Sequence, residues 1–188
     1  MKNTIIYLLG FPGVGKYTIA QELARQTQAL LIDNHLINNP IFSVVRADGK
    51  TKLAPQVWEY TAKIGDLVRE AIVTLTPPDE SFIFTNALAE EDAKGRAIYH
   101  KILDVALQRD SLFVPVRLLC DLPTLQSRIV EHDRRERMKM TDAEGIADDY
   151  RRYTVLQPGH PHTLELDTTH LTVQEAASAI MVKVASLA

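Results

Sequence analysis

A glycine-rich loop that follows a short apolar run constrains this chain more than any other feature. The loop and the residues after it read GFPGVGKYTIAQ at positions 10–21, and the apolar run before them is TIIYLL at positions 4–9. Glycines at this spacing let several backbone N–H groups turn toward one anion, and a lysine at the start of the next helix adds a positive charge. The stretch therefore predicts a buried strand, a phosphate-binding loop and a helix, in that order.

The rest of the chain alternates apolar runs with stretches of helical periodicity. Further strands are expected at 29–33, 81–86, 112–120 and 162–167. Helices are expected at 16–28, 55–75, 90–108, 122–137, 142–153 and 172–185. Apolar strands that alternate with helices indicate an α/β fold of three layers, α/β/α, in which one parallel sheet binds ligands at the carboxyl ends of its strands.

Three local features add detail to this pattern. Pro115 falls inside the fourth apolar run, and because proline cannot donate a ladder hydrogen bond we expect a strand start or a bulge there. Residues 34–79 look like an insertion that opens with turn-rich sequence (NNP, ADGK) before the long helix. Thr172 and Glu175 predict a capping box at the start of the last helix.

Composition limits the functions that are open to the chain. Its 188 residues, 46% of them apolar, suit a single domain with one core. A balance of 21 basic and 24 acidic residues gives no general attraction to nucleic acid, so an anion site has to be local. The one cysteine rules out an intramolecular disulfide, and no apolar run reaches the roughly 18 residues of a membrane span. We expect a cytoplasmic protein that binds neither nucleic acid nor membrane.

Four stretches together resemble the P-loop small-molecule kinases, a group that includes shikimate and gluconate kinases, chloramphenicol phosphotransferases and adenylate kinases. They are GFPGVGKYTIAQEL, the LLID run that ends in Asp33, RIVEHDRRERMK and LELDTTHLTVQEAASAI. The resemblance implies five parallel strands in the order 2-3-1-4-5, an acceptor-binding insertion at 34–79 and a lid at 131–142. It also implies ATP and Mg²⁺ as cofactors and a small-molecule acceptor whose hydroxyl receives the γ-phosphoryl group, in a monomer or a homodimer.

The residues expected to bind the nucleotide come from three segments. We expect Lys16 to hold the phosphates and to be catalytic. The resemblance places the segment DTTHLT, residues 167–172, against the nucleotide base through backbone contacts, and simple helix capping is the alternative. The full nucleotide set comprises Gly10, Pro12, Gly13, Val14, Gly15, Lys16, Tyr17, Thr18, Arg128, Asp167, Thr168 and Thr169.

The metal side departs from the resemblance at two positions. Tyr17 stands where a serine or threonine hydroxyl would join the magnesium shell, and a phenol is too long and rigid for that place. Its ring packs outside the loop, or lies over a phosphate or the base. Thr18 and Asp33 are then the candidates to help hold Mg²⁺, through water. Asn86 ends the third strand where an acidic residue is usual, so either Asp33 or Glu90 compensates, or Asn86 hydrogen-bonds the acceptor.

Asp33 is the main acid–base candidate, because a carboxylate at the end of the second strand can orient an acceptor hydroxyl and accept its proton. Its alternative role is the N-cap of a helix. The expected substrate-binding residues are Asp33, Asn34, His35, Trp58, Asn86 and Arg137. For His35 a packing or turn role is the alternative, and for Trp58 a place in the core.

Arginines in the run at 128–139 are candidates to stabilise the moving phosphoryl group, with Arg128 and Arg134 as the first choices. An ordinary charged helix is the alternative interpretation of this run. For the chain as a whole, the alternative to a kinase is a nucleotide-binding switch with weak or no phosphoryl transfer.

Overall fold

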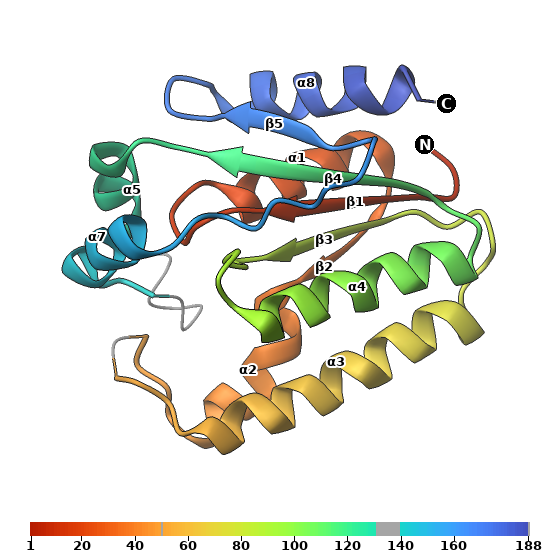
Figure 1. Ribbon diagram of the computed structural model, residues 1–188. Helices are drawn as coiled ribbons and strands as arrows, with labels where there is room; N and C mark the ends of the chain where they lie inside the picture. Colours follow the sequence, from red (N-terminus) through yellow and green to blue (C-terminus); the bar gives the residue numbers. More distant parts are fainter. Residues whose placement is uncertain (50, 131–139, 188) are drawn as a thin grey trace.

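A parallel five-stranded sheet with helices on both faces forms the body of the protein. The computed structural model describes residues 1–49, 51–130 and 140–187 (Figure 1). Its strands are β1 (Thr4–Leu9), β2 (Leu30–Asp33), β3 (Phe82–Asn86), β4 (Leu112–Leu119) and β5 (Leu164–Asp167). Its helices are α1 (Lys16–Thr27), α2 (Asn34–Val44), α3 (Pro55–Leu75), α4 (Ala93–Gln108), α5 (Leu122–Ile129), α7 (Ala143–Arg152) and α8 (Val173–Ala185).

The strand order is β2-β3-β1-β4-β5, and every neighbouring pair is parallel, which confirms the predicted fold class. All residues of β1 are buried, which explains why its sequence is continuously apolar. Ile6 and Leu8 pack on one face with α1 and α8, whereas Ile5 and Leu9 pack on the other with α4 and the end of α3. In Figure 1, α8 lies above the strands, α1 behind them, and α4 and α3 below.

Pro115 lies inside β4, so the prediction of a strand start or a bulge is wrong. It pairs with Tyr7 of β1 in a regular parallel register. The N–H of Leu112 donates to a carbonyl on the β1 side, so the N atoms of odd-numbered β4 residues face the opposite side. On that side, β5 pairs with β4 only from Val116 onward. The missing N–H of Pro115 therefore removes no hydrogen bond between the two strands.

The insertion begins with a helix rather than with the predicted turn-rich segment. Asp33 caps α2, and Pro40 lies within it. A proline inside a helix removes one backbone hydrogen bond, so packing has to stabilise this one. Phe42 is buried, and its ring meets that of Trp58 from α3 edge-on at 5.6 Å between centroids. Tertiary contact between α2 and α3 therefore overrides the local turn signal.

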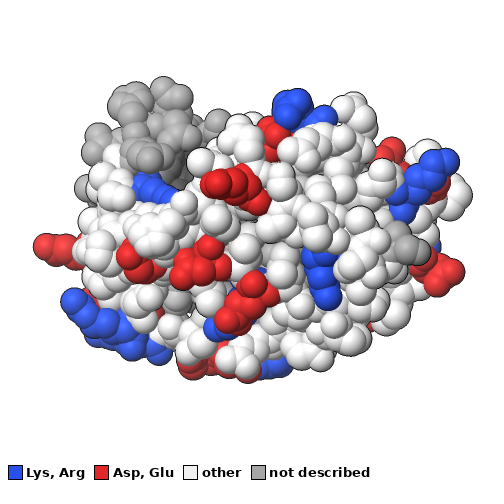
Figure 2. All heavy atoms as spheres, turned by 90° about the horizontal axis from the view of Figure 1, so that it is seen from above, with Lys and Arg blue, Asp and Glu red and all other residues white. Residues whose placement is uncertain are grey.

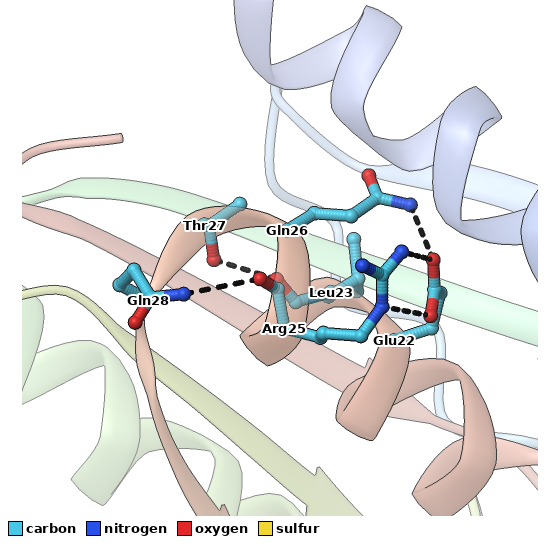
Figure 3. A network of polar contacts seen from close by, with 6 residues as sticks. All are labelled: Glu22, Leu23, Arg25, Gln26, Thr27 and Gln28. Carbon is cyan, nitrogen blue, oxygen red and sulfur yellow. Dashed lines mark hydrogen bonds and ion pairs between the residues drawn. The ribbon is translucent and has the colours of Figure 1, made fainter.

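The helix ends carry local polar bonds. In α1, Glu22 pairs with Arg25, and the last turn is closed by the hydroxyl of Thr27 on the Leu23 carbonyl (Figure 3). In α8, the predicted capping box between Thr172 and Glu175 is confirmed.

On the face that Figure 2 shows, acidic and basic side chains are interspersed among uncharged ones.

None of the helices in these described ranges combines the length and the apolar character that crossing a bilayer requires.

Candidate functional site

A cleft of about 890 Å³ opens at the carboxyl ends of the central strands, between the loop after β1, helix α2 and the start of α8. The predicted site residues that line it are Pro12, Gly13, Val14, Gly15, Lys16, Tyr17, Thr18, Asp33, Asn34, His35, Trp58, Arg128 and Thr168. Gly10, Asn86, Asp167 and Thr169 are not among the lining residues. Arg134, Arg137 and most of the predicted lid at 131–142 lie outside the described residues.

The loop between β1 and α1 has the geometry of an anion cradle. Gly13 and Gly15 adopt φ values of +91° and +96°, a region that residues with a side chain rarely enter. Gly15 caps α1 without any side-chain bond, and the helix N-terminus, where the helix dipole favours an anion, lies at the cleft. The ammonium of Lys16 donates to the carbonyls of Gly10 and Phe11 at 2.7 and 2.9 Å.

Gly10 supports this loop from beneath, whereas the sequence placed it among the nucleotide contacts. A Cβ at Gly10 would lie 2.7 Å from the carbonyl oxygen of Leu118 and 2.8 Å from Cγ1 of Val14. Distances this short do not occur in real structures, so glycine is required here by close backbone approach. Its carbonyl is one of the two that hold Lys16.

The segment after β5 forms one wall of the cleft. Thr168 is buried, and its hydroxyl lies 3.1 Å from the Val14 carbonyl in the loop. The guanidinium of Arg128 donates to the Thr168 carbonyl at 3.1 Å, so α5 and β5 are joined at the cleft wall. Asp167 and Thr169 instead build the turn: the carboxylate of Asp167 accepts the Thr169 N–H at 2.8 Å, and bonds from Thr169 lower the pKa of Asp167. The N-cap of α8 is Thr172, so this geometry gives Asp167 and Thr169 a role in the turn before the helix.

Asp33 is held at the end of β2 by two bonds to its carboxylate. Its Oδ1 accepts the Thr85 hydroxyl at 2.6 Å, and its Oδ2 accepts the His35 N–H at 3.2 Å as the N-cap bond of α2. The side chain is largely buried yet lines the cleft. The capping role is therefore present, and the same residue lines the cleft.

Helix α2 and the start of α3 form the far end of the cleft. Trp58 lines it with 49% of its surface exposed, and its ring contacts Phe42, which in turn contacts His35. Asn38 and Phe42 also line the cleft but were not predicted. The spacing of Asn34, Asn38 and Phe42, four residues apart, would have revealed them had this segment been read as a helix.

Asp149 of α7 is a further lining residue that sequence analysis missed. Burial first, and the neighbouring Asp148 second, raise the pKa of its carboxyl above the ordinary value.

Neither a family model nor a curated protein matches the chain. Solved structures do. A gluconokinase from Sinorhizobium meliloti 1021 aligns over 99% of this chain and 94% of its own, with a TM-score of 0.66 and 13% identity. The APS kinase of Mycobacterium tuberculosis, in complex with AMPPNP and APS, aligns over 97% and 98%, with a TM-score of 0.57 and 15% identity. A shikimate kinase from Acinetobacter baumannii, bound to shikimate, aligns over 97% and 93%, with a TM-score of 0.52 and 19% identity.

The chain has the fold of the P-loop small-molecule kinases. At such low identity the likeness concerns the fold, and this chain's own residues have to support any chemistry.

Within this P-loop kinase fold, Asn86 lies one hydrogen bond behind the cleft. Its Oδ1 accepts the hydroxyl of Tyr7 at 2.9 Å, and its Nδ2 donates to Oδ1 of Asn34 at 2.8 Å. Asn86 therefore contacts a cleft residue instead of lining the cleft itself. Sequence analysis missed this arrangement because Tyr7 lies 79 positions away in the sequence, although β1 and β3 are neighbours in the sheet.

Few of the described side chains at the cleft could contact a metal ion. Tyr17 and Thr18 both line the cleft at the start of α1. The described residues contain no cluster of three or more His, Cys, Asp or Glu side chains that could hold a metal ion. Thr18 and Asp33 supply oxygen atoms at the cleft, a donor set that suits an ion held mainly by phosphate oxygens and water.

Proposed function

We propose that this protein is an ATP-dependent phosphotransferase that moves the γ-phosphoryl group to a hydroxyl of a small molecule. The observation that carries the proposal is that a phosphate-binding loop with Lys16 and the carboxylate of Asp33 line one continuous cleft. Neighbours in fold support it: the APS kinase structure contains AMPPNP and APS, and the shikimate kinase structure contains shikimate. The acceptor is then a small molecule, and the cleft is large enough for it beside a nucleotide.

The loop would hold the β- and γ-phosphates through its N–H groups and the first turn of α1. Lys16 would exchange the two loop carbonyls that it now contacts for phosphate oxygens. Arg128 lies at the cleft wall, where a planar guanidinium can spread the charge of the moving phosphoryl group. Arg134 and Arg137, in the predicted lid, would add further positive charge that stabilises the moving phosphoryl group.

On the acceptor side, Asp33 would orient the reacting hydroxyl and accept its proton. Its two existing hydrogen bonds fix the carboxylate, which is the kind of preorganisation that positioning requires. Asn34 and His35 would bind the acceptor from the same turn, and Trp58 would form an aromatic wall.

Mg²⁺ fits the proposal as an ion carried largely by the nucleotide. Thr18 and Asp33 are the described residues that would contact it, through water. When bound, Mg²⁺ neutralises charge on the transferring phosphates.

The test is ADP release from ATP in the presence of polyols, shikimate-like acids, aminoglycosides and nucleosides. We expect acceptor-stimulated release, and a rate at least about 100-fold lower in Lys16→Ala because a phosphate ligand is lost. Lys94→Ala, which removes an exposed lysine of α4, is the matched control and should keep the full rate. Full activity in Lys16→Ala would refute the assignment. Nucleotide binding without acceptor-stimulated release would favour the switch instead.

A further inference from the structure

A chain of three side chains leads from the centre of the sheet to the acceptor end of the cleft. Tyr7 in β1 donates its hydroxyl proton to Asn86 Oδ1 at 2.9 Å. Asn86, at the end of β3, donates from Nδ2 to Oδ1 of Asn34 at 2.8 Å. Asn34 lines the cleft beside Asp33. We refer to Tyr7, Asn86 and Asn34 as the amide chain.

Burial of Tyr7 sets the direction of every bond in this chain. Its side chain has no exposed surface, and burial raises the pKa of its phenol, so the hydroxyl keeps its proton. Within the described residues Asn86 is the hydrogen-bond partner of that hydroxyl. If Asn86 were turned round, its NH₂ would point at the phenol, and the buried O–H would have no acceptor, which is costly. The carbonyl of Asn86 therefore faces Tyr7, and its NH₂ faces Asn34.

The same logic fixes Asn34. Its side-chain oxygen already accepts a bond from Asn86, and its backbone N–H donates to the Thr85 hydroxyl at 3.2 Å. Within residues 1–49, 51–130 and 140–187 no group accepts a bond from its side-chain NH₂, so these donor hydrogens are left for the cleft that Asn34 lines. Next to them stands the carboxylate of Asp33, which can only accept when ionised. The cleft thus presents a hydrogen-bond donor and an acceptor from two consecutive residues.

We propose that Tyr7 and Asn86 are positioning residues that hold the Asn34 amide with its NH₂ toward the acceptor, and that the acceptor carries a second oxygen beside the hydroxyl that is phosphorylated. This inference rests on the proposed function. The reacting hydroxyl donates to Asp33, and the adjacent oxygen accepts from Asn34. A sugar or polyol with vicinal oxygens has this chemistry, and an isolated alcohol lacks it.

The orientation can be tested without any acceptor, by NMR on the ¹⁵N-labelled full chain. We expect nuclear Overhauser contacts from the Asn86 NH₂ protons to the side chain of Asn34. Contacts to the Tyr7 ring in their place would mean the reverse orientation and would overturn the proposal. In Tyr7→Phe the phenol no longer fixes Asn86, so both sets of contacts should appear. Tyr99→Phe is the matched control, because Tyr99 stacks on Tyr7 at 5.9 Å and its hydroxyl has no partner among the described residues.

The specificity is tested with acceptor pairs in which one member lacks the oxygen beside the hydroxyl: glycerol and propane-1,3-diol, propane-1,2-diol and propan-1-ol, and cyclohexane-1,2-diol and cyclohexanol. For the pair that is phosphorylated, we expect kcat/KM to favour the vicinal compound by about tenfold, as for one hydrogen bond. Asn34→Asp turns the donor into an acceptor and should abolish this preference. Tyr7→Phe should reduce the preference, and Tyr99→Phe should leave it intact.

The outcomes separate the two proposals. Phosphoryl transfer without preference for vicinal oxygens, or a preference that survives Asn34→Asp, overturns this inference and leaves the proposed function standing. Absence of transfer to every compound overturns the specificity together with the proposed function, while the NMR measurement still decides the orientation of the amide chain.

Discussion

The hydroxyl of Thr168 ties the nucleotide side of the cleft to the phosphate loop, and its removal is a direct test of the site's architecture. Thr168 is 2% exposed, and its Oγ1 lies 3.1 Å from the Val14 carbonyl and 3.0 Å from the Leu119 carbonyl. The backbone N–H of Thr168 also donates to Leu119, at 2.8 Å, so Leu119 keeps a donor when the hydroxyl is lost. Thr168→Val therefore acts mainly on Val14.

The magnitude follows from the loss of that donor to a buried carbonyl, which costs about 1–3 kcal/mol. In a domain of this size each kcal/mol lowers Tm by about 2–4 °C, so the middle of the range predicts a decrease of about 4–8 °C for Thr168→Val. Thr168→Ser keeps the hydroxyl and loses one methyl group, worth about 0.8 kcal/mol, so its Tm should fall by about 2–3 °C.

Calorimetric melting and ATP titration of the two variants provide the assay. ATP should bind several-fold more weakly to Thr168→Val, because the loop carbonyl next to Gly15 loses its anchor, and close to normally to Thr168→Ser. A valine variant that melts at or above the serine variant would refute the claim that this hydroxyl holds the loop.

Three further predictions follow from single contacts. Tyr99→Phe should raise the free energy of unfolding, by about 1 kcal/mol, because it removes a buried hydroxyl that has no partner among the described residues; chemical denaturation checks this, and a loss of stability would contradict it. Asp149→Asn should stabilise the protein at pH 7, since ionised Asp149 is disfavoured by burial and by Asp148, which raises its pKa. The gain should vanish as the pH falls through that raised pKa and wild-type Asp149 becomes neutral, and Tm measured against pH checks the sign. Tyr17→Ser should increase ATP affinity in the presence of Mg²⁺ but not in its absence, by calorimetry; equal affinity with and without the metal would remove any metal-side role of this position.

The parts of the fold that were predicted correctly are those in which local signals agree with packing. The long stripe in 55–75 gave α3 with the observed bounds, and alternating apolar runs and helices gave the parallel sheet. The order of the strands was implied by the resemblance to the P-loop small-molecule kinases. Helix α2 was missed because Pro40 and the asparagines before it signal a turn locally. The helix is stabilised by the contact between Phe42 in α2 and Trp58 in α3. A local stretch of sequence cannot reveal such a contact between two helices.

The candidate site divides in the same way. The loop from Gly13 to Lys16 could be predicted because spacing, glycine chemistry and the following helix lie within one short stretch. Asn86 was misplaced because its role depends on Tyr7, which is 79 positions away in the sequence and adjacent only in the sheet.

The residue at position 86 determines where this edge of the cleft carries a hydrogen-bond donor and where it carries negative charge. An aspartate there would accept from both Tyr7 and Asn34, which would turn the Asn34 amide and present its oxygen to the cleft. With asparagine, the Asn34 NH₂ faces the cleft and the negative charge at this edge is left to Asp33. Asparagine at position 86, where the resemblance leads us to expect an acidic residue, thus removes one carboxylate that could support a metal ion. The same asparagine gives the acceptor side a hydrogen-bond donor, and Mg²⁺ would rely on phosphate oxygens. Asn86→Asp should therefore strengthen Mg²⁺-dependent ATP binding while it weakens binding of a vicinal acceptor. A variant in which both change in the same direction would show that position 86 does not divide the two sides.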